Sequence, residues 1–444
     1  MTNTLEIPSS SGDFMHSLAR RLWPIHRSIT GDGVRQTLAI LREHIPNLVV
    51  HEIPSGTQVF DWTVPDEWVI REAYLVDPSG RRILDIRDNN LHVVGYSTAI
   101  DTKLTLDELQ EHLHSIPEQP DAVPFVTSYY NRTWGLCLSE HQRASLQDGL
   151  YHVVIDADHI GGSLTYGEVL IPGDSDDEIL LSTYICHPSM ANNELSGPCV
   201  ATALAQWLVS SDTRHYTYRI VFVPESIGAI TYCSRNLKHM QETTVAGFQL
   251  TCIGDDRAYT YLASRNGHTR IDRIAERVIT SLPNHKVCSY LERGSDERTY
   301  CSPGIDLPVV SIMRTRYGDY PEYHTSHDDL VSVVTPSGLE GGFNAVRRCI
   351  ELLEAEKVLI STNLGEPQLG RRGLYHTLLN KNTSEEVMLR TNILAYADGE
   401  HSVADLVSLT HHNAAEISQM VEELKQHNLL RDSHQSNSNT PGPR

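Results

Sequence analysis

The sequence predicts an α/β protein with three parts: a mixed, mainly parallel sheet flanked by helices, an inserted antiparallel β domain and a C-terminal winged helix-turn-helix. Three patterns predict this class. After residue 151, apolar strand runs alternate with helical runs of about 10–15 residues, as in βαβ units. Polar and apolar residues alternate between residues 49 and 95, and three helical segments follow Gly365 and Pro367. The 444 residues suffice for several domains.

Two amphipathic helices are expected near the start of the chain. Phe14, Leu18 and Leu22 follow one another at intervals of four residues, which predicts a helix over residues 12–28. The same period resumes over residues 34–45 and ends at a proline.

Residues 49–95 have the pattern of short antiparallel strands. Polar and apolar residues alternate there, and Pro-Ser-Gly and Asp-Asn-Asn turns recur about every dozen residues. This pattern is typical of a sandwich or barrel, and it differs from the sequence on either side. We therefore expect an inserted β domain.

The α/β pattern begins at Tyr151. The nearly continuous apolar run over 178–188 is typical of a strand buried on both faces. In parallel sheets of this kind, chemistry collects at the carboxyl ends of the strands. The predicted strands are 164–173, 178–188, 218–226, 247–254 and 307–314, and the predicted helices are 196–211, 230–240, 268–282 and 339–360.

The C-terminal segments 385–399, 401–410 and 413–431 have the spacing of a winged helix-turn-helix. The residues after them are rich in Ser, Asn, Pro and Gly and predict a disordered tail. The expected domain ranges are 1–46 and 131–363 for the α/β domain, 47–130 for the inserted β domain, 367–432 for the winged helix and 433–444 for the tail.

The net charge argues against nucleic acid as a partner. Lys and Arg number 36 against 57 Asp and Glu, which gives 36 − 57 = −21. The last predicted helix carries Glu416, Glu422 and Glu423 against Lys425, so groove binding would be opposed electrostatically. We expect protein contacts instead, including a homo-oligomer formed through the winged helix or the inserted domain.

The cellular location expected from the sequence is the cytoplasm. The chain has no apolar run of about 18 residues, and its start lacks the charged and apolar regions of a signal peptide. Its eight cysteines are scattered without a C-x-x-C pair and are expected to be reduced core residues.

Candidate ligands follow three predicted strands. His187, Asn193 and Glu194 follow one strand, Glu225 follows the next, and His324 and His327 lie in a later loop. One by one, each is more often a structural residue than a ligand. Together, side chains of these types at one sheet edge could hold a catalytic zinc, which takes three protein ligands and leaves a fourth position for water.

The order of these segments resembles the zinc-dependent aminopeptidase superfamily, which includes the glutaminyl cyclases. His187, residues 191–197 (ANNELSG), residues 225–226 (ES), Ser295-Asp296 and residues 323–325 (YHT) match that family's motifs in order. The resemblance covers residues 1–46 and 130–360. With the inserted β domain and winged helix, the chain is similar to the bacterial aminopeptidase-like proteins of that architecture.

The departures from the family pattern lower the expected number of metal ions. Asn193 stands where the family has its metal-bridging Asp, Ser226 stands where it has a second Glu, and Thr251 or Cys252 stands where it has a further Asp. The resemblance then implies one zinc per chain, held by His187, Glu194 and His324. It places Glu225 as the catalytic general base and leaves Asn193, Asp255 and His327 as further metal or supporting candidates.

Substrate contacts are expected from residues around the late loop and one earlier segment. Arginine beside aromatic rings suits a substrate carboxylate, although packing within loops is an equally open interpretation. The candidates are Arg132, Trp134, Asp296, Arg314, Tyr317 and Tyr323.

The resemblance implies hydrolysis of an amide or peptide bond by an aminopeptidase-like enzyme, and we expect a small peptide or an amide-containing metabolite as the substrate. Two alternatives stay open: a metal-free binding or regulatory scaffold with a degenerate peptidase domain, and a glutaminyl-cyclase-like acyltransferase.

Overall fold

The computed structural model describes residues 11–129, 131–375 and 381–432. The chain divides into two compact units, residues 1–349 and 350–444. The fold class predicted from the sequence is confirmed in all three parts. The predicted tail at 433–444 lies outside the described residues.

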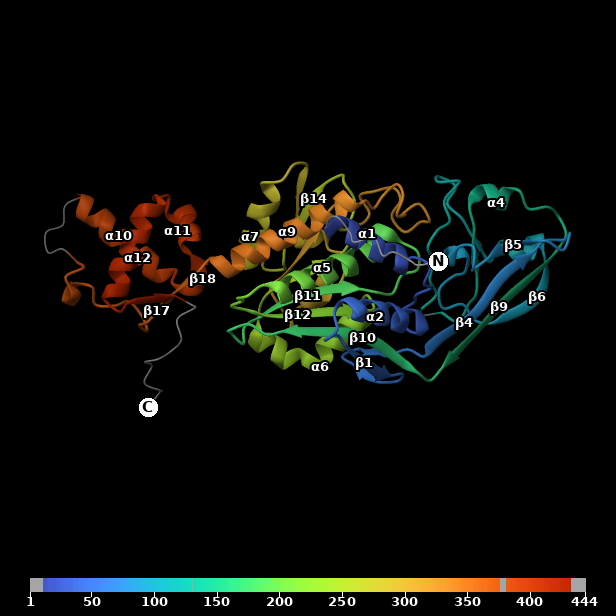
Figure 1. Cartoon of the computed structure of the whole chain (residues 1–444), viewed down its shortest axis with the longest axis horizontal. Helices are drawn as coiled ribbons and strands as arrows, with labels where there is room; N and C mark the ends of the chain where they lie inside the picture. The colour runs from blue at the N-terminus through green and yellow to red at the C-terminus, as the bar shows by residue number, and fades with distance from the viewer. Residues whose placement is uncertain (1–10, 130, 376–380, 433–444) are drawn as a thin grey trace, which may run out of the picture. The chain divides into compact units, whose positions relative to one another are not determined.

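The first unit is built around an eight-stranded sheet (Figure 1). In order across the sheet its strands are β1 (Val49–Pro54), β10 (Ser163–Ile171), β12 (Thr217–Val223), β11 (Glu178–Tyr184), β13 (Thr244–Leu250), β16 (Val309–Met313), β14 (Tyr259–Leu262) and β15 (His285–Cys288). The central strands β12, β11, β13 and β16 run parallel, and antiparallel pairs flank them on both sides. Every residue of β11 is buried, as its nearly continuous apolar sequence requires.

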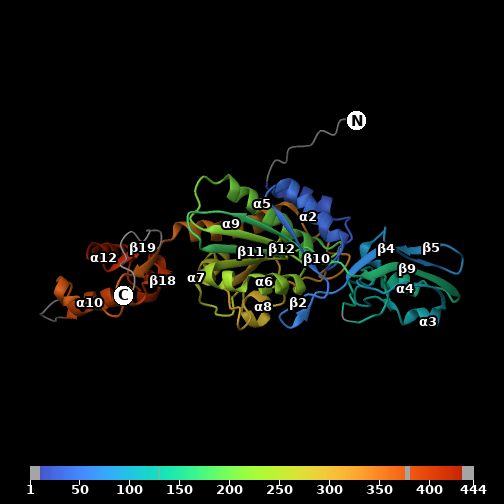
Figure 2. The ribbon, with the colours of Figure 1, turned by 90° about the horizontal axis from the view of Figure 1, so that it is seen from below.

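Helices cover both faces of this sheet. α1 (Ser11–Leu22), α2 (Asp32–His44) and α5 (Ser196–Ser210) lie on one face, while α6 (Ile227–Thr243) and α8 (Glu297–Tyr300) lie on the other (Figure 2). α7 (Arg270–Thr280) packs against β14, β15 and β16. α1 ends at Leu22 rather than at residue 28, because Pro24 disfavours helical geometry at the residue before it.

The inserted part contains a separate antiparallel sheet. Its strands, in order across the sheet, are β5 (Arg82–Asp85), β4 (Glu67–Val76), β9 (Leu150–Ile160) and β6 (Ile100–Thr105). A small hairpin, β2 (Gln58–Val59) with β3 (Trp62–Thr63), precedes it. Around the sheet lie α3 (Leu106–Gln110), α4 (Glu140–Ala144), the 3₁₀ turn η1 (Asn90–His92) and the short pair β7 (Leu113–His114) and β8 (Leu136–Cys137).

Two strands belong to a different sheet than their position in the sequence indicated. β1 lies within the range predicted for the inserted domain, yet it pairs with β10 at the edge of the main sheet. β9 reaches past the predicted start of the α/β part, yet it is a central strand of the inserted sheet. Alternating polarity shows that a strand has one buried face, but it does not show which sheet that face covers.

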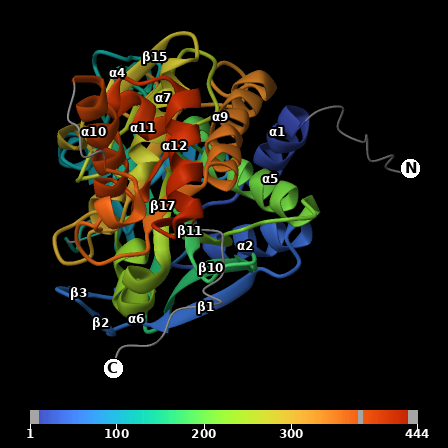
Figure 3. The ribbon, with the colours of Figure 1, turned by 90° about the vertical axis from the view of Figure 1, so that its left-hand side faces the viewer.

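The second unit has the winged-helix pattern. Helices α10 (Lys381–Ala395), α11 (Val403–Thr410) and α12 (Ala414–Gln426) pack with a three-stranded sheet (Figure 3). Its strands, in order across the sheet, are β18 (Asp398–Ser402), β17 (Val358–Ser361) and β19 (Leu430–Asp432). Leu389, Ile393, Leu406, Ile417 and Leu424 are buried in its core.

One predicted helix was too long at its C-terminal end. α9 spans Pro336–Ala355, and the predicted last residues of that helix form β17 instead. These residues pair with β18 and β19, so tertiary pairing overrides the local helical period there.

Among the described residues, no helix is long and apolar enough to cross a membrane. All eight cysteines are buried and free, in agreement with their interpretation as core residues.

Candidate active site

The first two candidate residues meet because their strands are neighbours. β11 and β12 run parallel, with Tyr184 beside Val223, so His187 and Glu225 leave the sheet at the same edge. The Nε2 atom of His187 lies 3.5 Å from Oε2 of Glu225. The parallel pairing predicted from the sequence therefore brings these two side chains together.

The backbone around this edge is held in an unusual conformation. Ser189, Ser226, Cys252 and His324 have positive φ angles of 42°, 62°, 46° and 58°. Residues other than glycine adopt this region at a cost of roughly 1–3 kcal/mol each, and such residues gather at functional sites. The four positions follow β11, β12, β13 and β16, so the strained residues cluster where the candidate side chains meet.

Glu194 lies on the far side of the His187 ring from Glu225. Its helical turn η2 (Ala191–Leu195) leads directly into α5, and its Oε2 atom is 2.9 Å from Nδ1 of His187. A carboxylate that contacts one ring nitrogen fixes the tautomer and the direction of the other nitrogen. Glu194 thus directs Nε2 of His187 toward Glu225.

A buried arginine stands behind this pair. The Arg27 side chain has no exposed surface, and its Nε atom lies 3.6 Å from Oε1 of Glu194. The same Nε donates to the His187 carbonyl at 2.9 Å, and NH1 donates to the Leu22 carbonyl at 2.8 Å. Burial opposes protonation of His187, but Cys186 and Glu194 beside it raise its pKa well above the usual value.

The Glu225 carboxylate has one engaged oxygen and one facing His187. Ser295 Oγ donates to Oε1 at 3.1 Å, while Oε2 points toward the imidazole. Burial raises the pKa of Glu225, although His187 opposes that rise. Asp296 is buried next to it and accepts from the Ser226 backbone N–H at 2.7 Å, while its second oxygen has no hydrogen-bond partner. Burial and the neighbouring Glu225 raise the pKa of Asp296 well above its usual value.

His324 completes the group from the late loop. Its ring centroid is 5.8 Å from that of His187, and its ring stacks on Tyr323 at 3.9 Å. Phe125, from the inserted part, places its ring edge-on to both histidines, and its N–H donates to the His324 carbonyl at 2.9 Å. Burial lowers the pKa of His324 to about 3, so the imidazole is neutral at ordinary pH.

The loop that carries His324 is tied to the turn that carries Glu194. Asp328 accepts from the backbone N–H groups of Asn192 and Asn193 at 2.7 and 2.9 Å, and from the Tyr320 hydroxyl at 3.1 Å. Burial raises the pKa of Asp328 to about 7. Close packing at the start of α5 also holds the turn that carries Glu194 in place. A Cβ on Gly197 would lie 2.2 Å from the Thr183 hydroxyl oxygen, so only glycine fits there.

The donors on the Glu225 side of His187 fit a zinc ion in type. They are the His187 and His324 imidazoles, a donor type of catalytic zinc sites, and the Glu225 carboxylate beside them has the position of a general base. With Zn–N bonds of about 2.0–2.1 Å, two imidazoles on one ion place their centroids about 5 Å apart, close to the 5.8 Å found. Glu194, predicted as a ligand, instead lies at the other ring nitrogen.

A second set of donors surrounds Nδ1 of His187. Ligand atoms of Cys186, His187 and Glu194 lie within 4.8 Å of one another, and all three residues are buried. Arg27 beside Glu194 places a positive charge at this group, and burial raises the pKa of the Cys186 thiol to about 11. Both features disfavour a cation there and favour the side that faces Glu225.

Three further metal candidates are occupied or distant. Asn193 Oδ1 accepts from the Tyr184 hydroxyl at 2.7 Å, while its buried Nδ2 has no partner. The Asp255 carboxylate accepts hydrogen bonds from Asn192, Thr315 and Arg257. His327 is exposed at the surface.

Most of the predicted substrate-binding residues have structural partners. Arg314 is buried and donates to the Ala258 and Gly338 carbonyls. Arg132 pairs with Asp66 at 3.1 Å. Trp134 stacks on His112, and Tyr317 donates to Glu297 at 2.9 Å. Asp296 and Tyr323 are the two members of the predicted set that lie near Glu225 and His324.

Sequence reasoning missed several residues of the site. Arg27 and Phe125 have no motif of their own, and their nearest neighbours in the chain carry no candidate residue. Trp62 and Tyr129 line a cavity with His187 and Glu225, although they precede those residues by more than fifty positions. Tyr129 lies in the same segment as the predicted residues Arg132 and Trp134, and that proximity was the signal available.

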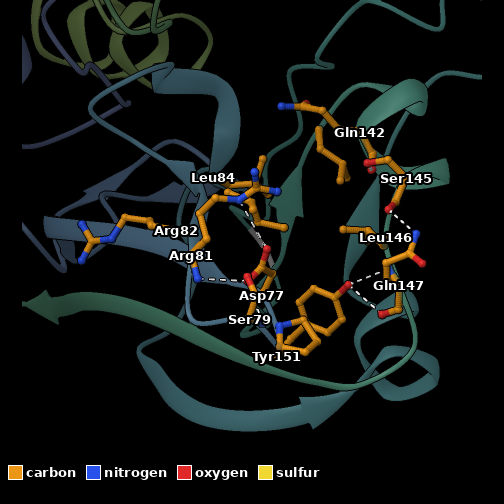
Figure 4. A pocket seen from close by; sticks show the side chains of 13 residues that line it. Asp77, Ser79, Arg81, Arg82, Leu84, Gln142, Ser145, Leu146, Gln147 and Tyr151 are labelled. Carbon is orange, nitrogen blue, oxygen red and sulfur yellow. Dashed lines mark hydrogen bonds and ion pairs between the residues drawn. The ribbon is translucent and has the colours of Figure 1, made fainter.

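The described residues also form a larger cavity within the inserted part, of about 550 Å³ (Figure 4). Several of its polar groups are engaged in hydrogen bonds: the Tyr151 hydroxyl donates to the Gln147 carbonyl at 2.8 Å, and Asp77 accepts from Ser79 at 2.6 Å. Its lining contains no histidine and one acidic residue, Asp77, so it offers no pair of candidate catalytic groups.

The eight-stranded sheet, with His and Glu side chains at its carboxyl edge, defines a zinc-aminopeptidase-like fold. The zinc aminopeptidase of Bacillus subtilis has the same fold: it is 13% identical with a TM-score of 0.56, over 77% of this chain and 94% of that one. The chain belongs to the family described as domain of unknown function DUF4910, whose pattern matches residues 16–356. A winged helix-turn-helix pattern matches residues 357–432.

Two more similar proteins come from Clostridium acetobutylicum. One, provisionally named a polysaccharide biosynthesis protein with aminopeptidase-like domain, is 42% identical over 90% of this chain and 91% of its own length. The other is the crystal structure of a provisionally named peptidase, 39% identical with a TM-score of 0.79, over 95% of this chain and 96% of that one. The present chain is an aminopeptidase-like domain protein with a C-terminal winged helix.

Proposed function

We propose that the protein is a metal-dependent hydrolase that cleaves an amide or peptide bond, with one zinc ion per chain. The observation that carries this proposal is the arrangement Arg27–Glu194–His187, which turns Nε2 of a buried histidine toward Glu225. The centroid of the His324 ring lies 5.8 Å from that of His187. His187 and His324 would hold the ion, with Glu194 behind His187 instead of on the metal. Substrates are small peptides or amide-containing metabolites.

In the proposed hydrolysis, each residue of the site has a separate role. Zinc, when bound, supplies an activated water and polarises a carbonyl group. Glu225 accepts the water's proton at Oε2, since Ser295 occupies Oε1, and returns it to the leaving nitrogen. Phe125 packs against both imidazoles and helps to exclude bulk water.

The test combines metal analysis with a Glu225→Gln variant. We expect about one zinc per purified chain, loss of amide hydrolysis after chelation, and recovery when zinc is returned. Glu225→Gln should retain zinc and lower kcat by roughly 10²–10⁴-fold. Glu242→Gln on α6, an exposed glutamate paired with Lys238, is the matched control and should behave as wild type. A zinc-loaded Glu225→Gln variant with full activity would contradict the role of Glu225.

A metal-free binding scaffold is a second candidate, and one observation favours it. Asn193 stands where the aminopeptidase superfamily has a metal-binding carboxylate, and Thr251 or Cys252 stands at a second such position. Asn193 and Thr251 are both hydrogen-bonded to the Tyr184 hydroxyl. The side-chain oxygens of Asn193 and Thr251 are therefore engaged in hydrogen bonds that connect the ends of neighbouring strands. Absence of bound zinc, with no activity after zinc is added, would select the scaffold.

A further inference from the structure

A small cavity opens directly beside His187 and Glu225. Its volume is about 220 Å³, below the roughly 300–1,000 Å³ of pockets that bind drug-sized molecules. It therefore has room for a single side chain or a group of similar size. Five of its lining residues are apolar or aromatic, namely Ile29, Trp62, Pro65, Tyr129 and Ile227.

The wall opposite the catalytic pair comes from outside the main sheet. Trp62 lies on β3, whose hairpin partner β2 packs against α6, the helix that begins at Ile227. Tyr129 packs edge-on against Tyr96 at 5.2 Å, and Ile29 is buried in the same apolar core. The wall is thus supported by packing on several elements.

The charge of the cavity selects against acidic groups. Its lining contains no lysine or arginine, and its ionisable members are Tyr129, Cys186, His187 and Glu225. The two arginines expected to meet a substrate carboxylate are held elsewhere, Arg132 by Asp66 and Arg314 by main-chain carbonyls. An acidic side chain would lose its hydration among these apolar residues and would meet the Glu225 carboxylate.

We propose that this cavity binds an uncharged apolar or aromatic side chain next to the scissile amide, and that Trp62 is the residue that determines this specificity. The inference rests on the proposed hydrolase function and adds a substrate class to it. A side chain of the size of leucine or phenylalanine would contact Trp62 and Tyr129, with its amide directed to Glu225 and His187.

The test compares substrates, variants and a ligand that cannot be cleaved. Wild-type protein is assayed with the 4-nitroanilides of leucine and phenylalanine and with the 1-(4-nitroanilide) of glutamic acid. We expect kcat/KM to be at least about tenfold higher for the apolar pair. Trp62→Ala should lower kcat/KM for that pair about tenfold, mainly through KM, and Trp62→Phe should lower it less. Trp207→Ala on α5, outside the cavity, is the matched control.

Benzylamine separates failure of this inference from failure of the hydrolase proposal, because it carries a ring and an ammonium but no scissile bond. Its binding is measured by calorimetry to wild type and to the Trp62→Ala and Trp207→Ala variants. Binding that depends on Trp62 without any hydrolysis would support the cavity and overturn the hydrolase. Equal kcat/KM for leucine and glutamate substrates, or hydrolysis unaffected by Trp62→Ala, would overturn the cavity alone. Neither binding nor hydrolysis would overturn both.

Discussion

Arg27 is a buried cation that contacts two residues of the candidate site. It has no exposed side-chain surface, and it contacts both Glu194 and the His187 carbonyl. Removing one member of a buried charge pair leaves the other uncompensated, which costs more than the pair itself contributes. Arg27 should therefore matter both for folding and for the direction of the His187 ring.

We expect Arg27→Met to lower the free energy of unfolding by about 3–5 kcal/mol. Urea denaturation measures this loss. Arg21→Met is the matched control, since the Arg21–Glu43 pair is about half exposed on both sides and should cost less than about 1 kcal/mol. Equal losses in the two variants would show that Arg27 is not an important buried charge.

A buried histidine in the inserted part should make stability depend on pH. His92 contacts the Cys137 carbonyl through Nδ1 at 2.8 Å, and burial lowers its pKa. Below the ordinary histidine pKa of about 6.5, the unfolded chain then binds a proton that the folded chain does not. This contribution to stability is complete above that pH and is lost as the pH falls.

The direction of this pH dependence is checked by urea unfolding at pH values from about 7.5 to about 5, on either side of the ordinary histidine pKa of about 6.5. The free energy of unfolding should fall with pH in wild type, and His92→Asn should reduce the slope while retaining a donor for the Cys137 carbonyl. His268→Asn, at an exposed position, should leave the slope as in wild type. An unchanged slope in His92→Asn would assign the dependence to other groups.

At the scale of elements, the start of α11 shows how local sequence stabilises the winged helix. Ser402 is its N-cap: its hydroxyl accepts from the Asp405 N–H, and the Asp405 carboxylate accepts from the Ser402 N–H at 2.8 Å. This capping box satisfies two backbone donors that the helix itself leaves unpaired. Ser408 lies inside the same helix and is exposed.

Ser402→Ala should lower the free energy of unfolding of the winged helix by about 1 kcal/mol. Ser408→Ala makes the same chemical change within the helix and should alter stability by no more than about 0.5 kcal/mol. Thermal unfolding followed by circular dichroism compares the two. A larger loss in Ser408→Ala would show that the cap is not what stabilises this helix.

At the scale of the whole molecule, the excess of acidic residues bears on what the winged helix does. On α12, Glu416 and Glu422 are exposed, and Lys425 is paired with Glu422 and Asp432 at 2.9 Å. A groove of about 720 Å³ between α10 and α12 is lined by further glutamates. These charges oppose approach to a phosphate backbone.

Fluorescence anisotropy of a labelled DNA duplex should show no binding up to about 100 μM protein at physiological salt, a range in which non-specific DNA-binding proteins do bind. The control is the double variant Glu416→Lys with Glu422→Lys, which reverses two charges on α12. This variant should bind the DNA duplex weakly and in a salt-dependent manner. Salt-dependent binding by the wild-type chain would contradict the prediction.

Much of the fold follows from the sequence because its signals are local. Continuous apolar runs, helical periods and caps lie within short windows, and they identified most elements of both units. The errors occurred where long-range pairing decides: β1 in the main sheet, β9 in the inserted sheet and β17 at the end of a predicted helix. In each case the side-chain pattern was compatible with more than one partner.

For the site, the sequence by itself determined which side chains follow neighbouring parallel strands, and so His187 and Glu225 could be predicted to meet. Only the tertiary structure decided which side of the His187 ring each carboxylate takes, with Glu194 at Nδ1 and Glu225 at Nε2. It also brought Arg27, Trp62 and Phe125 to the site from distant segments. The physical reason is that spacing along the chain specifies local geometry, whereas the direction of a buried ring depends on contacts that only the packed fold creates.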